Sequence, residues 1–326
     1  MLQTINLSSD SWSLAAFKDS TALRNFYTGN GCDGIELILC GENFREKICG
    51  DMVIGLHMIF YPEWICLWDN DFAYMDQEFG SRSAWQRFYG LNNRDELLLY
   101  YRHELDTAKQ LGAKYVVFHM GDNALEEYFT KIARHSQQKQ LSASCAFLNA
   151  LFSNGDEGVD LLLENMWLGC MNLTNPENTA YALSQICYPR TGLMLDTGHL
   201  LCTNPNLSSP EEGCRYIHEV LDRHEQLTER IWGMHLHSSY TGEYLKGMPF
   251  TPPAHELDYL TRFARANDHL QRIDRHQPFT AEGLPQLIQR ISPKYLCHEL
   301  NHGSSLSDWE SALQAQTAAL HAGRGS

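Results

Sequence analysis

Eight short segments rich in Val, Ile, Leu or Met recur along the chain, and this recurrence limits the fold more than any other feature. Near-continuous apolar runs of this length are typical of parallel strands that are buried on both faces. The eight segments are Thr4–Leu7, Gly34–Leu39, Met52–Ile59, Tyr115–His119, Val159–Glu164, Gly192–Asp196, Ile231–His237 and Tyr295–Leu300.

Stretches with helical periodicity separate most of these segments. In Asn93–Leu111 apolar residues recur at helical spacing, and Gly112 ends the pattern. Five other stretches have the same character: Ser142–Phe152, Thr179–Ile186, Pro210–Leu221, Leu284–Ile291 and Ser307–Leu320. Eight strands alternating with helices predict an α/β fold, the (β/α)8 or TIM barrel. A doubly wound open sheet is the alternative, but it usually has fewer strands and a Gly-rich first turn, which is not found here.

The length of 326 residues suits one barrel, since such barrels run from about 200 to over 400 residues. We find no repeat and no linker, so we expect a single domain over residues 1–326. Two connections, 60–92 and 238–273, are long and carry many aromatic residues. They follow the third and seventh strands, so we expect loop insertions at the active-site face. Most of their aromatic side chains should pack on outer helices and a few should line the pocket.

The net charge of -15, with no basic run, disfavours polymeric nucleic acid as a partner and favours a small-molecule substrate. Bound divalent metals would offset part of this charge. The ten cysteines include no CxxC pair, which indicates free thiols in a reducing cytoplasm. We see no signal peptide and no apolar run of membrane-spanning length, so we expect a cytoplasmic protein with no membrane partner.

Residues that can bind metal stand at the end of nearly every strand from the third onward. They are His57, His119, Glu164, Asp196, His199, His235, His237 and Glu299, and Asp274 and His276 follow the second long connection. An acid in an apolar run is costly to bury unless it is paired or bound to a metal. Barrel strands converge at their carboxyl ends, so these residues should meet in space. Any one histidine is more often an ordinary core or surface residue, but their coincidence predicts a metal site. The mixture of His and carboxylate favours zinc, with manganese or iron as alternatives.

This pattern resembles the xylose isomerase-like TIM barrels, the superfamily of endonuclease IV and of sugar isomerases and epimerases (the AP endonuclease 2 family). The shared core is an acid after strand five, Asp-x-x-His after strand six, a His on strand seven and a Glu on strand eight. Those residues are here Glu164, Asp196 with His199, His235 and Glu299. Met-His-Leu-His-Ser around His235 is similar to a Met-His-Leu-Asn-Asp run of the family, so we prefer His235 over His237 as the ligand.

The chain also resembles the endonuclease IV branch, which adds a His after strand three, a His-x-Gly and an Asp-Arg-His. These fall at His57, at His119 and at Asp274-Arg275-His276, so all nine positions of a trinuclear pattern are filled. The resemblance implies up to three Zn²⁺ ions. Their ligands would be His57, His119 and Glu164 for the first, Glu164, Asp196, His235 and Glu299 for the second, and His199, Asp274 and His276 for the third.

A cluster of three metals suits hydrolysis of a phosphoester. Our first hypothesis is therefore a metal-dependent phosphodiesterase or related hydrolase acting on a small phosphorylated molecule. The aromatic connections suggest a flat or apolar substrate part, such as a nucleotide or a cobamide. The second hypothesis is a sugar or sugar-phosphate isomerase or epimerase with one metal, in which Glu164 and Glu299 move protons. An AP endonuclease acting on DNA is a third, although its DNA-binding loops are not recognisable. A non-catalytic, metal-stabilised barrel is a fourth.

Glu164 and Glu299 are thus the expected catalytic residues. Five further residues are candidates for substrate contacts because they adjoin the expected ligands or lie in the second long connection. They are Asn165, Trp167, His237, Tyr240 and Arg275.

Overall fold

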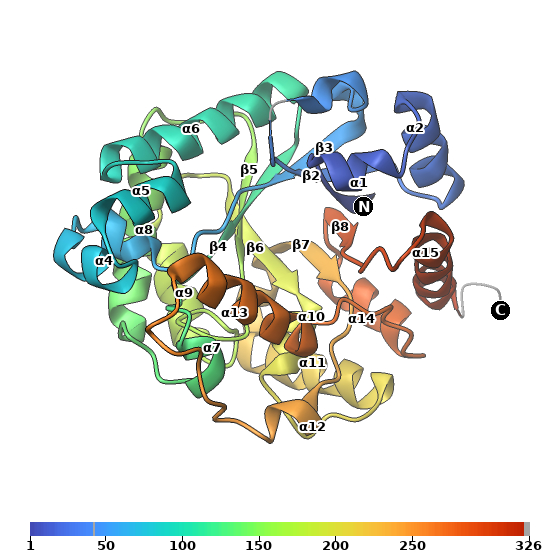
Figure 1. Cartoon of the computed structure of the whole chain (residues 1–326). Coiled ribbons are helices and arrows are strands. Elements are labelled where there is room, and N and C mark those ends of the chain that lie inside the picture. The colour runs from blue at the N-terminus through green and yellow to red at the C-terminus, as the bar shows by residue number, and fades with distance from the viewer. Residues whose placement is uncertain (42, 323–326) are drawn as a thin grey trace.

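Eight parallel strands close into a barrel in the computed structural model, which describes residues 1–41 and 43–322. Each strand pairs with the next in the sequence, and β8 pairs with β1 to complete the circle (Figure 1). The strands are β1 (Leu2–Ser8), β2 (Gly34–Ile38), β3 (Val53–His57), β4 (Tyr115–His119), β5 (Asp160–Glu164), β6 (Thr191–Asp196), β7 (Ile231–Leu236) and β8 (Tyr295–His298). The prediction of a (β/α)8 barrel is confirmed.

Helices surround the barrel and occupy the connections between strands (Figure 1). They are α1 (Ser11–Ala15), α2 (Ser20–Gly29), α6 (Arg94–Leu111), α7 (Glu127–Thr130), α8 (Gln137–Leu151), α9 (Pro176–Gln185), α10 (Thr197–Cys202), α11 (Pro210–His224), α14 (Leu284–Ile291) and α15 (Leu306–His321). Helix α6 begins where the Asn93 side chain accepts hydrogen bonds from the backbone N–H groups of Asp95 and Glu96, and it ends at Gly112 in the left-handed conformation. Short 3-10 turns lie at Asn43–Glu46, Gly50–Met52 and Glu225–Arg230.

The two long connections, predicted as loop insertions, contain several helices. Residues 60–92 form α3 (Trp64–Trp68), α4 (Phe72–Glu78) and α5 (Arg82–Tyr89), and residues 238–273 form α12 (Gly242–Leu245) and α13 (Tyr259–Ile273). The two segments pack on each other, with the rings of Phe79 and Tyr259 stacked 3.7 Å apart. The aromatic residues here are buried or half-buried, which hides the polar-apolar alternation by which a short helix is recognised.

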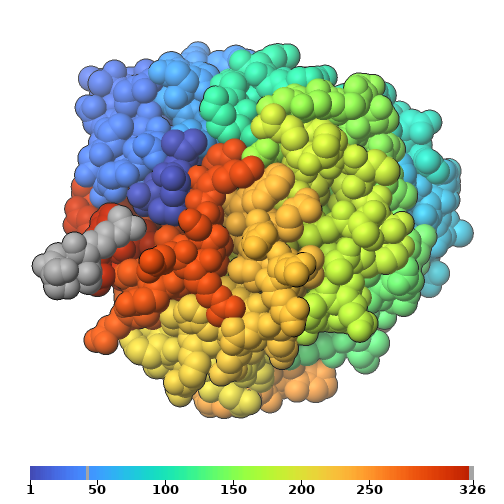
Figure 2. Space-filling model, turned by 180° about the vertical axis from the view of Figure 1, so that it is seen from behind, coloured from blue at the N-terminus to red at the C-terminus, as the bar shows by residue number. Residues whose placement is uncertain are grey.

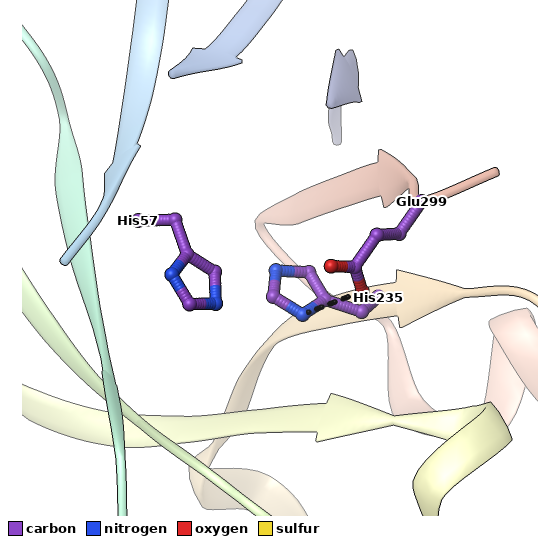
Figure 3. Close-up of side chains that lie close together, drawn as sticks. All are labelled: His57, His235 and Glu299. Carbon is purple, nitrogen blue, oxygen red and sulfur yellow. Dashed lines mark ion pairs between the residues drawn. The ribbon is translucent and has the colours of Figure 1, made fainter. Parts of the chain in front are cut away.

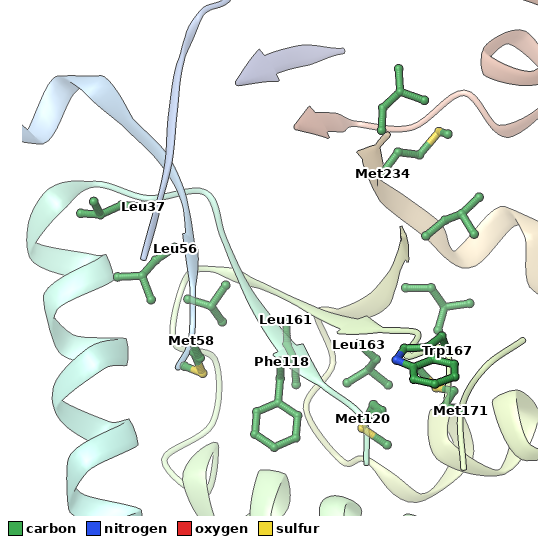
Figure 4. Packing of buried hydrophobic residues seen from close by; sticks show 14 of the residues in the cluster. Leu37, Leu56, Met58, Phe118, Met120, Leu161, Leu163, Trp167, Met171 and Met234 are labelled. Carbon is green, nitrogen blue, oxygen red and sulfur yellow. The ribbon is translucent and has the colours of Figure 1, made fainter. Parts of the chain in front are cut away.

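Two layers of apolar side chains fill the molecule because successive residues of a strand point to opposite faces. Outward-pointing residues such as Leu161, Leu163 and Phe118 pack beneath the helices (Figure 4). Inside the barrel lies a second, smaller cluster of Ile54, Tyr115, Val117, Leu162, Met194 and Tyr295. A Cβ at Gly55 would lie 2.1 Å from the Tyr115 ring, so only glycine leaves room for that ring. The apolar cluster fills the barrel below the strand ends and leaves the carboxyl ends to polar residues.

The first and last segments of the described chain lie side by side, as the blue and red surfaces in Figure 2 and the pairing of β1 with β8 both show. All ten cysteines are unpaired. Among the described residues, no helix has both the length and the apolar character needed to cross a membrane.

Candidate metal centre

The alternation along each strand carries metal-capable side chains into the barrel at its carboxyl end. In β5, Leu162 and Glu164 share the inward face, and in β6 Met194 and Asp196 do so. The strand register then pairs His119 with Glu164, and Asp196 with His235. Side chains from β3, β7 and the end of β8 converge in the same space (Figure 3).

The first group of donors consists of His57, His119 and Glu164. Their atoms form a triangle in which Glu164 Oε2 lies 3.1 Å from His57 Nε2 and 3.1 Å from His119 Nε2, and the two nitrogens are 3.1 Å apart. Ligand atoms of a tetrahedral zinc site are about 3.3–3.6 Å apart, given bonds of about 2.0–2.2 Å. His57 Nδ1 donates to the Met58 carbonyl at 2.9 Å, which leaves the Nε2 lone pair for this triangle.

The central group consists of Glu164, Asp196, His235 and Glu299, all of them buried. His235 Nδ1 lies 3.3 Å from Glu164 Oε1, 3.1 Å from Glu299 Oε2 and 3.8 Å from Asp196 Oδ2. Glu164 therefore serves two groups, with Oε2 toward the first and Oε1 toward the central one. Such a shared carboxylate can bridge two metal ions.

Glu36 holds His235 in this orientation and was missed from the sequence. This buried acid in β2 accepts a hydrogen bond from His235 Nε2 at 2.9 Å and one from the Tyr115 hydroxyl at 2.6 Å. With its Nε2 proton held by Glu36, His235 turns a free Nδ1 toward the central group. A carboxylate behind a histidine is the usual device that fixes the tautomer of a metal ligand. The available indication was an acid inside the apolar run Ile-Glu-Leu-Ile.

A third group consists of His237, Asp274 and His276, whose ligand atoms lie within 4.8 Å of one another. His276 Nε2 is 2.6 Å from Asp274 Oδ2, and its Nδ1 donates to the Glu299 carbonyl at 3.0 Å. His199, in the first turn of α10, places its Nε2 3.2 Å from the same Asp274 oxygen. His276 has a φ of 49°, an uncommon backbone conformation that is found more often at functional sites.

The electrostatics of the three groups favour bound positive charge. Burial would lower the pKa of the His57 imidazole, but Glu164 raises it to about 9. Burial also lowers the pKa of His276, and Asp274 outweighs this and raises it to about 10. Burial raises the pKa of Asp196, whereas His199 and His237 bring it down to about 2. Asp196 is therefore held as an anion, whereas burial raises the pKa of Glu299 and lowers the pKa of His119, so a bound cation would offset the cost of burying these two groups.

The residues present fit divalent metal ions. Four buried ligand atoms at these groups have no hydrogen-bond partner: Glu164 Oε1, His235 Nδ1, His237 Nδ1 and Glu299 Oε2. An unsatisfied buried polar atom costs about 1–3 kcal/mol, and cations among these four would satisfy them. The mixture of imidazole and carboxylate donors suits zinc first, then manganese or iron.

A cavity of about 640 Å³ lies over the groups. His119, His199, Asp274 and His276 contribute to its wall. Aromatic rings of Trp12, Phe60, Tyr128 and Trp167 and amides of Asn6, Asn267, Gln271 and Asn301 line the rest. No Lys or Arg is among the described residues that line it. An anionic substrate would therefore depend on bound metal for its recognition.

The five candidate substrate contacts are placed differently from one another. Only Trp167 lines the cavity. Asn165 is fully buried, where its side chain donates to the Asp196 carbonyl and its own carbonyl accepts from His199 Nδ1, so it positions ligands. His237 belongs to the third group. Tyr240 packs near Phe279 and Arg275 is exposed, and neither lines the cavity.

Comparisons with known proteins agree with this architecture. A family model described as xylose isomerase-like TIM barrel matches residues 78–295. A search of curated protein sequences found no match.

Several solved structures share the fold over nearly the whole chain. The IOLI protein with a bound zinc atom is 12% identical, with 98% of each chain covered and a TM-score of 0.54. A sugar phosphate isomerase/epimerase from Parabacteroides distasonis is 11% identical, covers 99% of this chain and 97% of its own, and has a TM-score of 0.52. The 3-keto-D-glucoside 4-epimerase YcjR from E. coli is 11% identical, covers 97% and 99%, and has a TM-score of 0.50. Identities this low establish the fold alone. On the family match, which covers about two thirds of the chain, the chain belongs to the xylose isomerase-like TIM barrel family.

Proposed function

We propose that this protein is a metal-dependent hydrolase that cleaves a phosphoester of a small molecule at a centre of up to three divalent ions. The carrying observation is a set of neighbouring donor groups. The first and central groups share Glu164, His57 also groups with His235 and Glu299, and the third group lies beside them. A one-metal enzyme needs only the central group. The first and third groups, with their buried ligand atoms, then require another explanation, which a multinuclear centre provides.

Divalent ions, when bound, would supply Lewis acidity and would activate water at neutral pH. The chain itself performs the remaining tasks. Glu36, Asn165 and the Met58 carbonyl orient ligands through hydrogen bonds, so the donors keep their geometry when substrate enters. The aromatic and amide walls of the cavity hold the part of the substrate that does not react.

The cavity also restricts the substrate. Its described lining has flat apolar surfaces and neutral amides, with no Lys or Arg. The whole chain carries a net charge of -15. A nucleic acid backbone would meet no basic surface there, which counts against DNA. A compact phosphoester with a flat or apolar, uncharged remainder, such as a nucleoside or a corrinoid, matches these walls better.

An isomerase or epimerase of a sugar or sugar phosphate is the second candidate, and two observations favour it. Glu164, Asp196, His235 and Glu299 form a four-residue group around one position, with two glutamates able to move protons at a carbon beside a carbonyl. The sugar isomerase and epimerase names among the structures with this fold also lean toward this candidate. It leaves the first and third groups unexplained.

Activity assays on a paired variant separate the two candidates. The chain is loaded with Zn²⁺ or Mn²⁺ and assayed on bis(p-nitrophenyl) phosphate, on nucleotide diesters, on ketohexoses with and without phosphate, and on an abasic-site duplex. The hydrolase predicts cleavage of a small phosphodiester, lost in Asp274→Ala/His276→Ala. Interconversion of sugars that survives in that variant would replace it with the isomerase.

A further inference from the structure

Trp12 is the only Phe, Tyr or Trp among the described residues whose side chain is exposed, with 72% of its surface open to solvent. It lies in α1, a short helix that the Asp10 side chain caps by accepting from the Ser13 N–H. Leu14 and the following Phe17 are buried in the core and anchor this segment. The segment is therefore fixed while the Trp12 indole, a large apolar ring, stays open to a ligand.

A second cavity, of about 380 Å³, adjoins the cavity over the donor groups at this indole. Three residues line both cavities: Trp12, His302 and Gly303. The rest of the second lining comes from α1 and from the start of α15, which lie on the same side of the barrel (Figure 1). Because the two linings share these residues, one bound molecule can reach from the donor groups into the second cavity.

Part of the wall of the second cavity is a fixed, flat surface. His302 stacks on Trp309 with ring centroids 3.6 Å apart and planes 20° apart, and Trp309 is fully buried. The Gly303 N–H donates to Asn301 Oδ1 at 2.8 Å. Gly303 has a φ of 67°, and a Cβ there would lie 2.5 Å from Asp308 Cβ, so this turn requires glycine. A ligand that enters a cavity with a preformed wall has less ordering to induce, which favours binding.

The second cavity has an uncharged lining. None of the described residues that line it is Asp, Glu, Lys or Arg. Burial lowers the pKa of His302 to about 4, so this imidazole is neutral at neutral pH. A charged group that entered would lose hydration and gain no partner, whereas an uncharged flat ring would gain contact with the indole.

We propose that the second cavity is a subsite for a flat, uncharged ring of the substrate, with Trp12 as the residue on which that ring stacks. This inference rests on the proposed function, because it takes the cavity over the donor groups as the place of the reacting phosphoester. The substrate then has two parts, an anionic part at the donor groups and an aromatic or heterocyclic part at Trp12.

Nuclear magnetic resonance with 2-naphthol, an uncharged flat ring, tests the subsite without using the metal centre. The metal-free chain carries ¹⁵N in its indoles, and the Trp12 signal is assigned by its loss in Trp12→Tyr. Titration with 2-naphthol should shift the Trp12 signal saturably. The signal of Trp232, a half-buried indole at the amino end of β7, should stay in place. Cyclohexanol, uncharged but not flat, should shift neither signal.

Three variants measure the contribution of the indole. Trp12→Ala should weaken 2-naphthol binding about tenfold, the usual effect of removing one stacking aromatic ring. Trp12→Tyr keeps a ring and should stay within about threefold of the native chain. Leu99→Ala is the matched control, because Leu99 is an exposed apolar residue of α6 that lines neither cavity. Since Trp12 is exposed, its removal leaves no void in the core.

The subsite and the proposed function can fail separately. If 2-naphthol does not shift the Trp12 signal, or binds Trp12→Ala as tightly as the native chain, the subsite is refuted and the metal centre is untouched. If 2-naphthol binds as expected but the zinc-loaded chain cleaves no phosphoester, the hydrolase proposal fails. The second cavity is then still a ring-binding site, but the assignment of its ligand as part of a phosphoester is overturned.

Discussion

Replacing Glu36 with Gln should weaken metal binding although Glu36 is not itself in a ligand group. Both of its carboxylate oxygens are in use, Oε1 by His235 Nε2 at 2.9 Å and Oε2 by the Tyr115 hydroxyl at 2.6 Å. Glutamine has one acceptor oxygen and one NH₂ group, so it can satisfy only one of these donors. If its NH₂ faces His235, that imidazole must accept at Nε2 and carry its proton on Nδ1, where the proton blocks the central group.

The size of the effect follows from the loss of one orienting carboxylate. Removing a partner behind a histidine ligand typically weakens metal affinity 10–100-fold, which is about 1.4–2.7 kcal/mol. Competition with a zinc chelator of known affinity measures it directly. Tyr115→Phe is the matched control, since it removes the other hydrogen bond to Glu36 and leaves the His235 contact in place, so we expect a change of less than about threefold. Equal affinities for the native chain and Glu36→Gln would refute the orienting role of Glu36.

Three further predictions concern stability. Burial raises the pKa of Glu63 to about 7 from 4.5, so the stability that neutral Glu63 contributes is present below about pH 4.5 and is lost as pH rises through about 7. Relative to the native chain, Glu63→Gln should therefore gain up to about 3 kcal/mol of stability between about pH 5 and pH 8.5. Equal pH profiles of the two proteins in urea unfolding would contradict this. Gly55→Ala would place a Cβ 2.1 Å from the Tyr115 ring and should lower the free energy of unfolding by about 1–3 kcal/mol or more. Gly29→Ala is the control: Gly29 has open space around it, so its stability should change by less than about 0.5 kcal/mol. Similar melting temperatures for both variants would show that the Tyr115 ring moves aside at little cost. Arg262→Leu leaves the acid of the largely buried Arg262–Glu78 pair without a partner and should cost about 3–5 kcal/mol by denaturant unfolding, so a loss below about 1 kcal/mol would mean that Glu78 reaches water.

The barrel could be predicted because its strands are buried on both faces and therefore form apolar runs that no loop imitates. The residues of the donor groups could be predicted for the same reason. Glu164, for example, ends an apolar run, and an acid there needs a partner. Alternation then places Glu164 on the inward face with Leu162, as the structure has it.

Two kinds of feature were not predictable from the sequence. Helices α3, α4 and α5 have five to eight residues each, too few turns for periodicity to stand out among so many aromatic residues. The course of a long connection is also set by tertiary packing. Tyr240 lies in the second long connection and Arg275 lies between Asp274 and His276, yet neither side chain lines the cavity.

His237 illustrates a subtler limit. Residues two apart on a strand share a face, so alternation alone places His235 and His237 together, and only the resemblance of Met-His-Leu-His-Ser to the family's run favoured His235. The structure places His235 Nδ1 in the central group and His237 Nδ1 toward Asp274.

The number of metal ions per chain tests the central claim most directly. Protein purified without added metal, and again after dialysis against zinc, is analysed for metal content and protein concentration. We predict about three ions per chain after loading, and about one fewer in Asp274→Ala/His276→Ala. A content of about one ion, unchanged in that variant, would contradict the multinuclear centre and leave the central group as a single-metal site.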